Sequence, residues 1–210
     1  SLAYSLFSYA QAWFKHYYPH IFFASHVSLL AAKNKLEKAH KIINNGRSMG
    51  IEIKAPHALH SKERATWSAD KKTIFLPFTT IKGVKDETAI AIPRVAQGCT
   101  SVLSFMLKAR KEPAIKKNHL IDLARIGGFD GMDQQPRLKT VAQINYCLAR
   151  VTAKQSDEVF TEFWNQAATF TCLGEIDNQR KAQIEVEVFG SFINESPLDR
   201  MLPWLQENGW

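Results

Sequence analysis

Apolar residues at helical spacing recur along most of the chain and predict a mainly α-helical fold. Pro19 should separate the first two helices, because the residue before a proline avoids the helical conformation. Two short stretches alternate instead, so residues 51–53 are expected to form a strand and residues 67–76 a β-hairpin with a polar turn. The helices expected from the pattern cover residues 2–18, 20–32, 36–49, 86–92, 101–106, 118–126, 131–155 and 179–190.

One turn between two of these helices has the layout of a helix-hairpin-helix, a motif that binds the DNA backbone without reading base sequence. In FTTIKGVKDETAIAI (residues 78–92), Ile81 leads into a tight turn and Asp86 is the expected N-cap of the following helix. Gly83 can take a backbone conformation closed to other residues, so the N–H groups of the hairpin and of the next helix can face one phosphate. The alternative is an ordinary turn between two core-packed helices.

The hairpin departs from the usual motif at Lys85, which stands where a second glycine is common. Its two lysines nevertheless add fixed positive charge for a phosphate. The DNA-binding residues predicted from this stretch are Lys82, Gly83, Val84, Lys85 and Thr88.

A second, degenerate hairpin is expected around Pro113, between the helices at residues 101–106 and 118–126. Pro93 should end or kink the preceding helix near Ile92. A tandem arrangement is expected because one hairpin alone buries too little apolar area to be stable. The predicted fold is therefore mainly α, with an N-terminal helical segment, a small β-hairpin, a tandem helix-hairpin-helix and C-terminal helices.

The first helix carries a polar stripe opposite its apolar side. Offsets of three, seven, ten and fourteen residues place Ser1, Tyr4, Ser8, Gln11 and Lys15 on one face. Hydroxyls, an amide and a terminal cation on one face suit a nucleotide or a phosphate. A solvated helix face is the plainer alternative.

Composition and charge indicate which kinds of partner and which compartment suit the chain. The net charge of +7 and the pI near 9.3 suit a polyanion. Cys99, Cys147 and Cys172 are too few and too far apart for a disulfide framework or a zinc ribbon. With no signal peptide and no apolar run of membrane length, a cytoplasmic protein without a membrane partner is expected. The chain begins inside an amphipathic helix without a starting methionine, which we interpret as a piece of a longer protein.

The sequence predicts neither a metal site nor a complete catalytic centre. Pro19 lies between His16 and His20, and no carboxylate or thiol completes that pair or the pair His57 and His60. The acidic residues are scattered, with no Asp-x-Asp pair for the two Mg²⁺ ions that a nucleotidyl transferase uses. Phosphate-loop and nucleophile-elbow motifs are missing as well. A binding segment is therefore favoured over a complete enzyme.

Several separated stretches together resemble the bacterial C-family replicative DNA polymerases, of the DNA polymerase III alpha-subunit type. The order and spacing agree from Ser1 to about Met201, although Lys85, Ser196 and a basic loop at 56–66 depart from the family and are compatible with a phage-encoded or otherwise distant member. The stretches that carry the resemblance are SLAYSLFSYAQAWFKHYYPHIFF, RSMGIEIKAP, IKGVKDETAIAI, SVLSF, NHLIDLARIGGFDGM and IEVEVFGSFINESPLDRM.

The resemblance implies four regions. They are the end of a fingers domain (1–50), a small β element (51–78), a helix-hairpin-helix region (79–130) and a helical connector toward a C-terminal domain (131–210). It also implies DNA synthesis from deoxynucleoside triphosphates on a primer-template. The Mg²⁺ ions would be held by palm aspartates outside this chain, so the chain alone is expected to be inactive.

The resemblance also assigns roles to the two candidate surfaces. The stripe of Ser1, Tyr4, Gln11 and Lys15 would face the nascent base pair or the triphosphate, and the hairpin would hold the duplex behind it. The expected partners are duplex DNA, the triphosphate and the remaining polymerase domains or an upstream polypeptide, with a sliding clamp as a further candidate. The alternatives are a polymerase-derived DNA-binding module that works without a catalytic partner and a regulatory domain that contacts other replication proteins.

Overall fold

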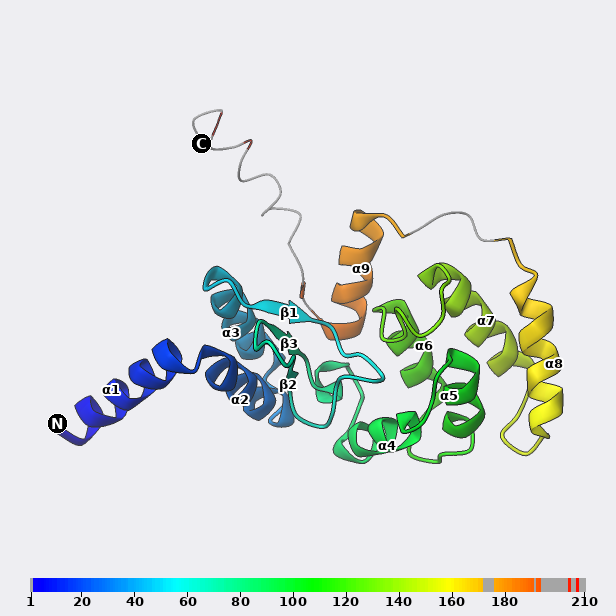
Figure 1. Ribbon diagram of the computed structural model, residues 1–210, viewed down its shortest axis with the longest axis horizontal. Helices are drawn as coiled ribbons and strands as arrows, with labels where there is room; N and C mark the ends of the chain where they lie inside the picture. Colours follow the sequence, from blue (N-terminus) through cyan, green and yellow to red (C-terminus); the bar gives the residue numbers. More distant parts are fainter. Residues whose placement is uncertain (1, 172–175, 191, 194–203, 205–206, 208–210) are drawn as a thin grey trace.

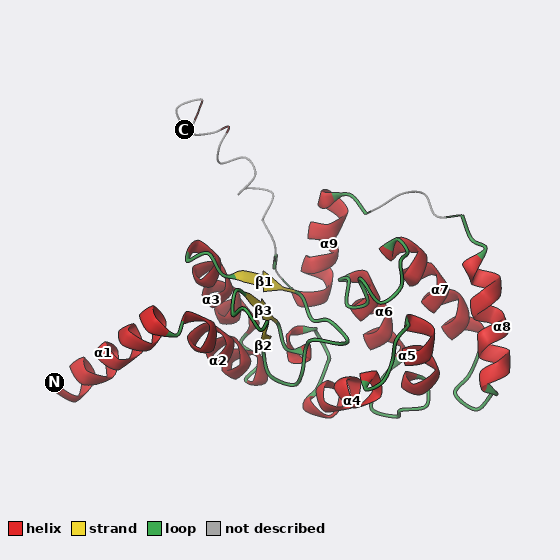
Figure 2. Cartoon of the chain, viewed as in Figure 1, coloured by secondary structure: helices red, strands yellow, loops and turns green. Residues whose placement is uncertain are grey.

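The computed structural model describes residues 2–171, 176–190, 192, 193, 204 and 207, and this part of the chain is mainly α-helical, as predicted (Figures 1 and 2). None of its helices is long and apolar enough to span a membrane. Ser1, Cys172, Ser196 and Met201 lie outside the described residues. The elements are α1 (Leu2–Tyr17), α2 (Pro19–Ala32), α3 (Leu36–Ser48), β1 (Glu52–Lys54), β2 (Thr66–Trp67), β3 (Thr73–Phe75), the 3-10 helix η1 (Phe78–Thr80), α4 (Asp86–Ala96), α5 (Val102–Ala109), α6 (Lys117–Arg125), α7 (Arg137–Arg150), α8 (Asp157–Ala168) and α9 (Asn178–Phe189).

The small sheet has the strand order β1-β3-β2 and lies against α2 and α3 (Figure 2). Strands β2 and β3 form the predicted hairpin, with Trp67 opposite Ile74 in antiparallel register. The predicted strand at residues 51–53 is β1, and it pairs with β3 in parallel, which places Ile53 beside Ile74. Both isoleucines are buried, so this pairing is stabilised by apolar packing as well as by backbone hydrogen bonds.

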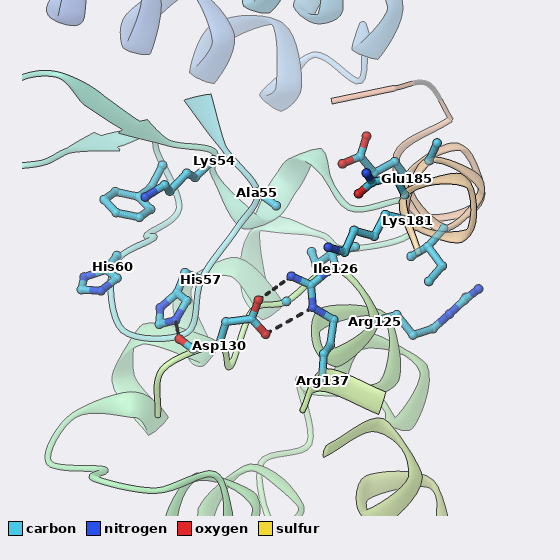
Figure 3. Close-up of a pocket in the computed structure, with 15 residues that line it drawn as sticks. Lys54, Ala55, His57, His60, Arg125, Ile126, Asp130, Arg137, Lys181 and Glu185 are labelled. Carbon is cyan, nitrogen blue, oxygen red and sulfur yellow. Dashed lines mark hydrogen bonds and ion pairs between the residues drawn. The ribbon is translucent and has the colours of Figure 1, made fainter. Parts of the chain in front are cut away.

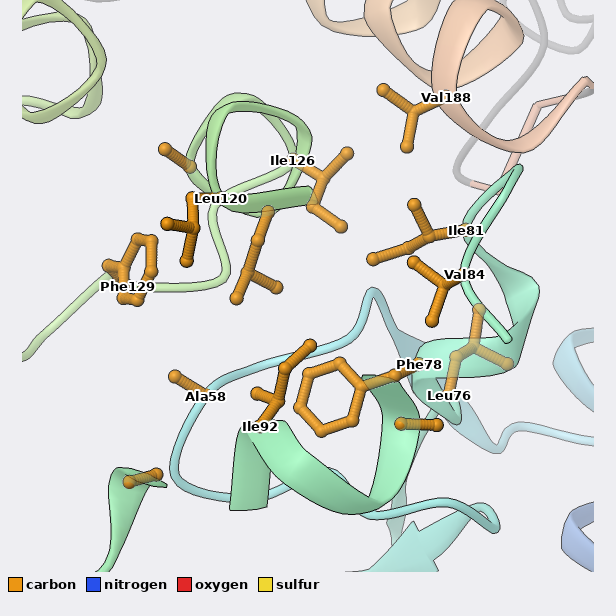
Figure 4. Packing of buried hydrophobic residues seen from close by; sticks show 14 of the residues in the cluster. Ala58, Leu76, Phe78, Ile81, Val84, Ile92, Leu120, Ile126, Phe129 and Val188 are labelled. Atoms are coloured by element: carbon orange, nitrogen blue, oxygen red, sulfur yellow. The ribbon is translucent and has the colours of Figure 1, made fainter. Parts of the chain in front are cut away.

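One hydrophobic core continues from the sheet through the hairpin to α9. Figure 4 shows its middle part, where side chains from the hairpin, α4, α6 and α9 point toward one another. Burying one large apolar side chain contributes about 1.5–3 kcal/mol, so this cluster fixes the hairpin firmly on the body of the protein. Its labelled members are Ala58, Leu76, Phe78, Ile81, Val84, Ile92, Leu120, Ile126, Phe129 and Val188.

Helix α4 differs in two details from the helix predicted at residues 86–92. Lys85 is its N-cap and Asp86 is its first residue, so the expected N-cap lies one position too late. The helix also continues past Pro93 to Ala96 instead of ending near Ile92. Val95 and Ala96 are buried, and their packing offsets the hydrogen bond that proline cannot donate.

The C-terminal half corrects two further expectations. Gly131 has a left-handed φ of +82° and does not begin the helix expected at residues 131–155. Helix α7 begins at Arg137, after the N-cap residue Pro136, and ends at Arg150. The weakly periodic stretch after α7 contains α8, which begins where the Ser156 side chain accepts a hydrogen bond from the Val159 N–H. Phe160 and Trp164 of α8 are buried, whereas Phe170 follows the helix end and is 39% exposed.

Helix α1 differs from the other helices because no residue of it is buried. It extends away from the sheet and from the remaining helices, and its nearest neighbour along the chain is α2 (Figure 1). Its large apolar side chains are exposed, from 40% at Trp13 to 80% at Leu2. The periodic pattern therefore predicts the helix correctly, while the surface that would cover its apolar side does not come from the described residues.

Candidate nucleic-acid interface

The turn between η1 and α4 is a tight hairpin with glycine at its tip. The Val84 N–H donates to the Ile81 carbonyl at 3.1 Å and closes the turn. Gly83 has φ +77°, and other residues adopt such a left-handed conformation at a cost of about 1–2 kcal/mol. A Cβ at Gly83 would meet nothing within 4 Å, so the backbone conformation, and not a lack of space, favours glycine here. The tip therefore exposes backbone without a side chain above it.

Two of the predicted DNA-binding residues, Val84 and Thr88, have buried side chains. Val84 is 9% exposed and Thr88 is 4% exposed. The Thr88 hydroxyl donates to the Ala114 carbonyl at 2.7 Å and fastens the start of α4 to the connector that leads into α6. A DNA contact at these two positions would therefore have to come from the backbone.

Lys82 ties the hairpin to the C-terminal end of α9. Its backbone N–H donates to the Val188 carbonyl at 2.9 Å, and its ammonium group donates to the Val186 carbonyl at 3.3 Å. The last carbonyls of a helix lack partners within the helix and attract positive charge, so both contacts stabilise this end of α9. Gly190, with φ +85°, ends the helix beside the Lys82 side chain. Lys82 thus has a structural role before any DNA is present.

Lys85 is exposed at the point where α4 begins. It is the N-cap residue, and no side chain caps the first N–H groups of the helix. Uncapped N–H groups and the helix dipole both favour an anion at this end. Asp86 and Glu87 in the first turn already place negative charge there, which weakens the attraction for a phosphate.

The start of α6 lies beside the same hairpin. His119, in the first turn of α6, is 7% exposed, and its Nδ1 accepts a hydrogen bond from the Lys116 N–H at 3.2 Å. The other side of the imidazole hydrogen-bonds to the backbone of Gly83. Lys116 and Lys117 are exposed at this helix start, so their charges join that of Lys85 around the hairpin. These two lysines are not among the DNA-binding residues predicted from the sequence, although they stand side by side three residues after Pro113.

His119 is held in its neutral form. Burial lowers its pKa most, and the nearby positive charge of Lys116 lowers it further. The hydrogen bond to the Gly83 backbone and the charge of Asp122 act in the opposite direction. Because Nδ1 accepts a hydrogen bond from Lys116, the proton of the neutral ring lies on Nε2, which can donate to the Gly83 carbonyl.

The comparisons with known proteins agree with this geometry. Residues 50–138 match the family model of the helix-hairpin-helix motif. The chain is 24% identical over 202 residues to the DNA polymerase III subunit alpha of two strains of Staphylococcus epidermidis, covering 95% of this chain and 18% of theirs. It is 35% identical over 135 residues to the DNA polymerase III subunit alpha of Ureaplasma parvum, covering 62% of this chain and 13% of that protein. Over most of its length, this chain is therefore similar to the DNA polymerase III alpha subunits.

This relationship confirms the family resemblance predicted from the sequence motifs. The chain spans less than a fifth of the length of these curated relatives. The matched helix-hairpin-helix region begins before β1 and ends at the start of α7, so it includes the hairpin and the α5–α6 pair on both sides of Pro113.

The predicted nucleotide-binding stripe lies on α1. This helix is at one end of the molecule, and the group of helices α4–α8 lies toward the other end (Figure 1). Tyr4 and Gln11 are exposed, and Ser1 lies outside the described residues. Lys15 is only half-exposed, because its ammonium group lies 5.8 Å from the centre of the Phe23 ring on α2. The stripe and the hairpin are therefore two separate surfaces of the described chain.

No metal site is found in the described part of the chain, where no three His, Cys, Asp or Glu side chains come together. His16 and His20 lie on different helices, α1 and α2. His57 and His60 stack on each other, with ring centres 4.7 Å apart. Cys99 and Cys147 are buried free thiols, and burial raises the pKa of Cys147 to about 11.

Proposed function

We propose that this chain binds the backbone of duplex DNA as the helix-hairpin-helix part of a C-family replicative DNA polymerase. The observation that carries the proposal is the exposed, left-handed Gly83 at the tip of the hairpin. Backbone N–H groups at such a tip can approach a phosphate closely, and they carry no information about base sequence.

The starts of α4 and α6 supply the charge for this contact. Lys85 lies at the start of α4, and Lys116 and Lys117 are exposed at the start of α6, where His119 contacts the backbone of Gly83. The positive dipole end of each helix lies at the same place as these lysines. The carboxylates of Asp86 and Glu87 oppose an anion at α4. We therefore infer that the α6 start provides the larger share of the phosphate attraction.

The polymerase role of the wider protein rests on the relatives. DNA synthesis would need Mg²⁺ and palm carboxylates outside this chain, so this chain alone is expected to give no product in primer extension with Mg²⁺ or Mn²⁺. Addition of the polypeptide that carries the palm should restore extension, with Tyr4, Gln11 and Lys15 directed at the nascent base pair. Template-dependent extension by this chain alone would contradict this division of roles.

The decisive test of the hairpin uses two matched glycine variants, Gly83→Val and Gly50→Val. Gly50 has φ +80° and open space around it, so both changes have a similar backbone cost of about 1–2 kcal/mol. Only the change at Gly83 also covers the N–H groups of the hairpin. In titrations of a labelled duplex, Gly83→Val should lose affinity, and Gly50→Val should bind as the parent chain does.

Salt dependence checks the type of contact. If the hairpin meets about two to four phosphates, the log–log slope of affinity against salt should be about −2 to −4, and the affinity should not depend on base sequence. Lys85→Ala should reduce the slope by about one. If Gly83→Val binds like the parent chain at both low and high salt, the hairpin is a structural turn and the duplex binds elsewhere.

A further inference from the structure

A polar cavity lies beside the N-terminal half of α9, whereas the hairpin contacts the C-terminal end of the same helix. It has a volume of about 590 Å³, which is in the usual range for small-ligand pockets. Figure 3 shows it between the segment that follows β1, the turn between α6 and α7, and the N-terminal half of α9. None of the predicted nucleotide-binding or DNA-binding residues lines it.

The charge of the cavity favours an anion. Four cationic side chains line it against two carboxylates. Arg137 is paired with Asp130 through two hydrogen bonds, and Arg125 is paired with Asp122 and Glu187. Because both arginines are already paired with carboxylates, the positive charge that is available to a ligand comes from two lysines.

The two lysines lie on different walls of the cavity. Lys54, the last residue of β1, is 3.3 Å from Glu52, but both side chains are more than half exposed, and such a pair is weak. Lys181, on α9, has no ion pair in the described part of the chain. Lys54 lies on the wall with the histidines, and Lys181 lies on the wall with Glu185 (Figure 3). A phosphate between the two ammonium groups would gain charge-assisted hydrogen bonds from both.

A column of three rings forms part of the first wall. The His57 and His60 rings are stacked with centres 4.7 Å apart, and the His60 and Phe75 rings are stacked with centres 4.8 Å apart. His60 is the middle ring, so only the outer faces of the two end rings, His57 and Phe75, are left uncovered by the column, and such a face can stack an aromatic base. An acidic peptide would use the lysines but leave this surface without a partner.

Hydrogen bonds hold one end of the column in place. The His57 Nδ1 accepts from the Leu59 N–H at 3.1 Å, and its Nε2 donates to the Asp130 carbonyl at 2.8 Å. Both ring nitrogens are therefore engaged, and the ring is fixed in its neutral form. The same Asp130 holds Arg137, whose guanidinium lies so close to Gly127 that a Cβ there would clash with it. The site is thus preorganised without a ligand.

We propose that this cavity binds one nucleotide unit, with the base on the ring column and the 5′-phosphate between Lys54 and Lys181. The unit is either a free deoxynucleotide or one residue of a single DNA strand, because both present the same base and phosphate. This site is independent of the hairpin, and its test can fail while duplex binding persists.

The test is calorimetric titration of the chain with deoxyadenosine 5′-monophosphate, inorganic phosphate and deoxyadenosine. The nucleotide should bind at least about tenfold more tightly than either half, since it makes both kinds of contact. Lys181→Ala should weaken nucleotide binding about tenfold, as expected for one lost charge-assisted hydrogen bond, and Lys181→Arg should restore part of it. His60→Ala removes the middle ring that holds the two end rings in place and should weaken binding by a similar factor, and His60→Phe should preserve it.

Controls separate this site from the hairpin and from folding. Lys154→Ala removes an exposed lysine in the turn between α7 and α8 and should bind the nucleotide as the parent does. Lys181→Ala should leave duplex affinity and the melting temperature unchanged. A short 5′-phosphorylated single strand then identifies the source of the nucleotide. Competition that is weakened by Lys181→Ala indicates a strand, and failure to compete indicates a free nucleotide.

The proposal is overturned by either of two results. One is that the monophosphate does not bind at millimolar concentration. The other is that it binds equally well to the parent chain, to Lys181→Ala and to His60→Ala.

Discussion

The hairpin and helix α1 are both candidate nucleic-acid surfaces, but this chain builds them very differently. The hairpin rests on buried Ile81 and Val84 and is tied to three other parts of the fold: α9, the connector before α6, and His119. Helix α1 buries none of its residues, and its stripe is positioned only by its own helical geometry and by the contact of Lys15 with Phe23.

The difference shows what a sequence pattern can establish. A turn that needs a left-handed glycine and a buried apolar residue on each side specifies its own geometry. An amphipathic helix specifies only that its apolar side packs against something. The predictions below test this contrast, beginning with the largest expected effect.

The first prediction compares Ile81→Ala with Leu6→Ala. Ile81 is 1% exposed in the core under the hairpin, and its truncation should cost about 2–5 kcal/mol of unfolding free energy. Leu6 is 62% exposed on α1, and its truncation should change stability by less than about 0.5 kcal/mol. Chemical denaturation followed by circular dichroism measures both. A large loss in Leu6→Ala would mean that α1 packs in solution and would remove the contrast.

The second prediction concerns the bond between Thr88 and Ala114. Thr88→Val keeps the shape of the side chain but leaves the half-buried Ala114 carbonyl without this donor, at a cost of about 1 kcal/mol. The start of α6 should also lose its fixed place beside the hairpin, so duplex affinity should fall and depend less steeply on salt. Thr88→Ser retains the hydroxyl and serves as the control. Unchanged duplex affinity in Thr88→Val would show that the α6 start takes no part in binding.

The third prediction is a pH dependence of the hairpin. The pKa of His119 in the folded chain is lowered, so below pH 6.5 the unfolded chain binds the proton more readily than the folded chain does. Its contribution to stability is therefore present at neutral pH and is lost as the pH falls from the unfolded pKa toward the folded one. His20, His40 and His57 also have lowered pKa values and add the same trend.

A matched variant isolates the part that comes from His119. His119→Gln keeps a polar side chain without a titrating ring. The parent chain should lose both stability and duplex affinity between pH 7.5 and pH 5.5, and the variant should lose less of each. Melting temperatures and duplex titrations at both pH values provide the measurement. Equal acid sensitivity in the two proteins would show that the His119 ring does not control the hairpin.

The fourth prediction concerns Lys15→Ala, which should change stability little. A half-buried cation beside an aromatic ring contributes only about 0.5–1 kcal/mol, so the chain should unfold almost as the parent does. In the polymerase reassembled with its palm, the same change should lower nucleotide affinity, and Lys15→Arg should retain more of it. Equal nucleotide affinity and turnover in Lys15→Ala and the parent would show that the stripe is a solvated helix face.

The sequence predicted features that depend on neighbouring residues. The helices, the β2–β3 hairpin, the exposed tip at Gly83 and the helix end at Gly190 all follow from local spacing and backbone chemistry. The continuation of α4 through Pro93 was missed because proline is unfavourable locally, whereas Val95 and Ala96 are buried by distant parts of the chain.

The details of the candidate site were harder to predict because they depend on long-range packing. No local pattern shows that Lys82 reaches the end of α9, that Thr88 meets Ala114, or that His119 lies under the hairpin. Lys116 and Lys117 join the site only because long-range contacts, from His119 to the Gly83 backbone and from Thr88 to Ala114, hold the start of α6 there. The nucleotide-sized cavity is likewise formed by three segments that are far apart in the sequence.

The contact between Lys82 and α9 also bears on the order in which the chain folds. The Lys82 ammonium group and the Val186 carbonyl are 104 residues apart in the chain. Contacts between residues so far apart in the sequence form late in folding, because a large loop must lose its conformational freedom before the contact forms. During synthesis the hairpin would emerge well before the helix that receives it. The turn at Gly83 can form early, but its fixed orientation on the protein has to wait for α9.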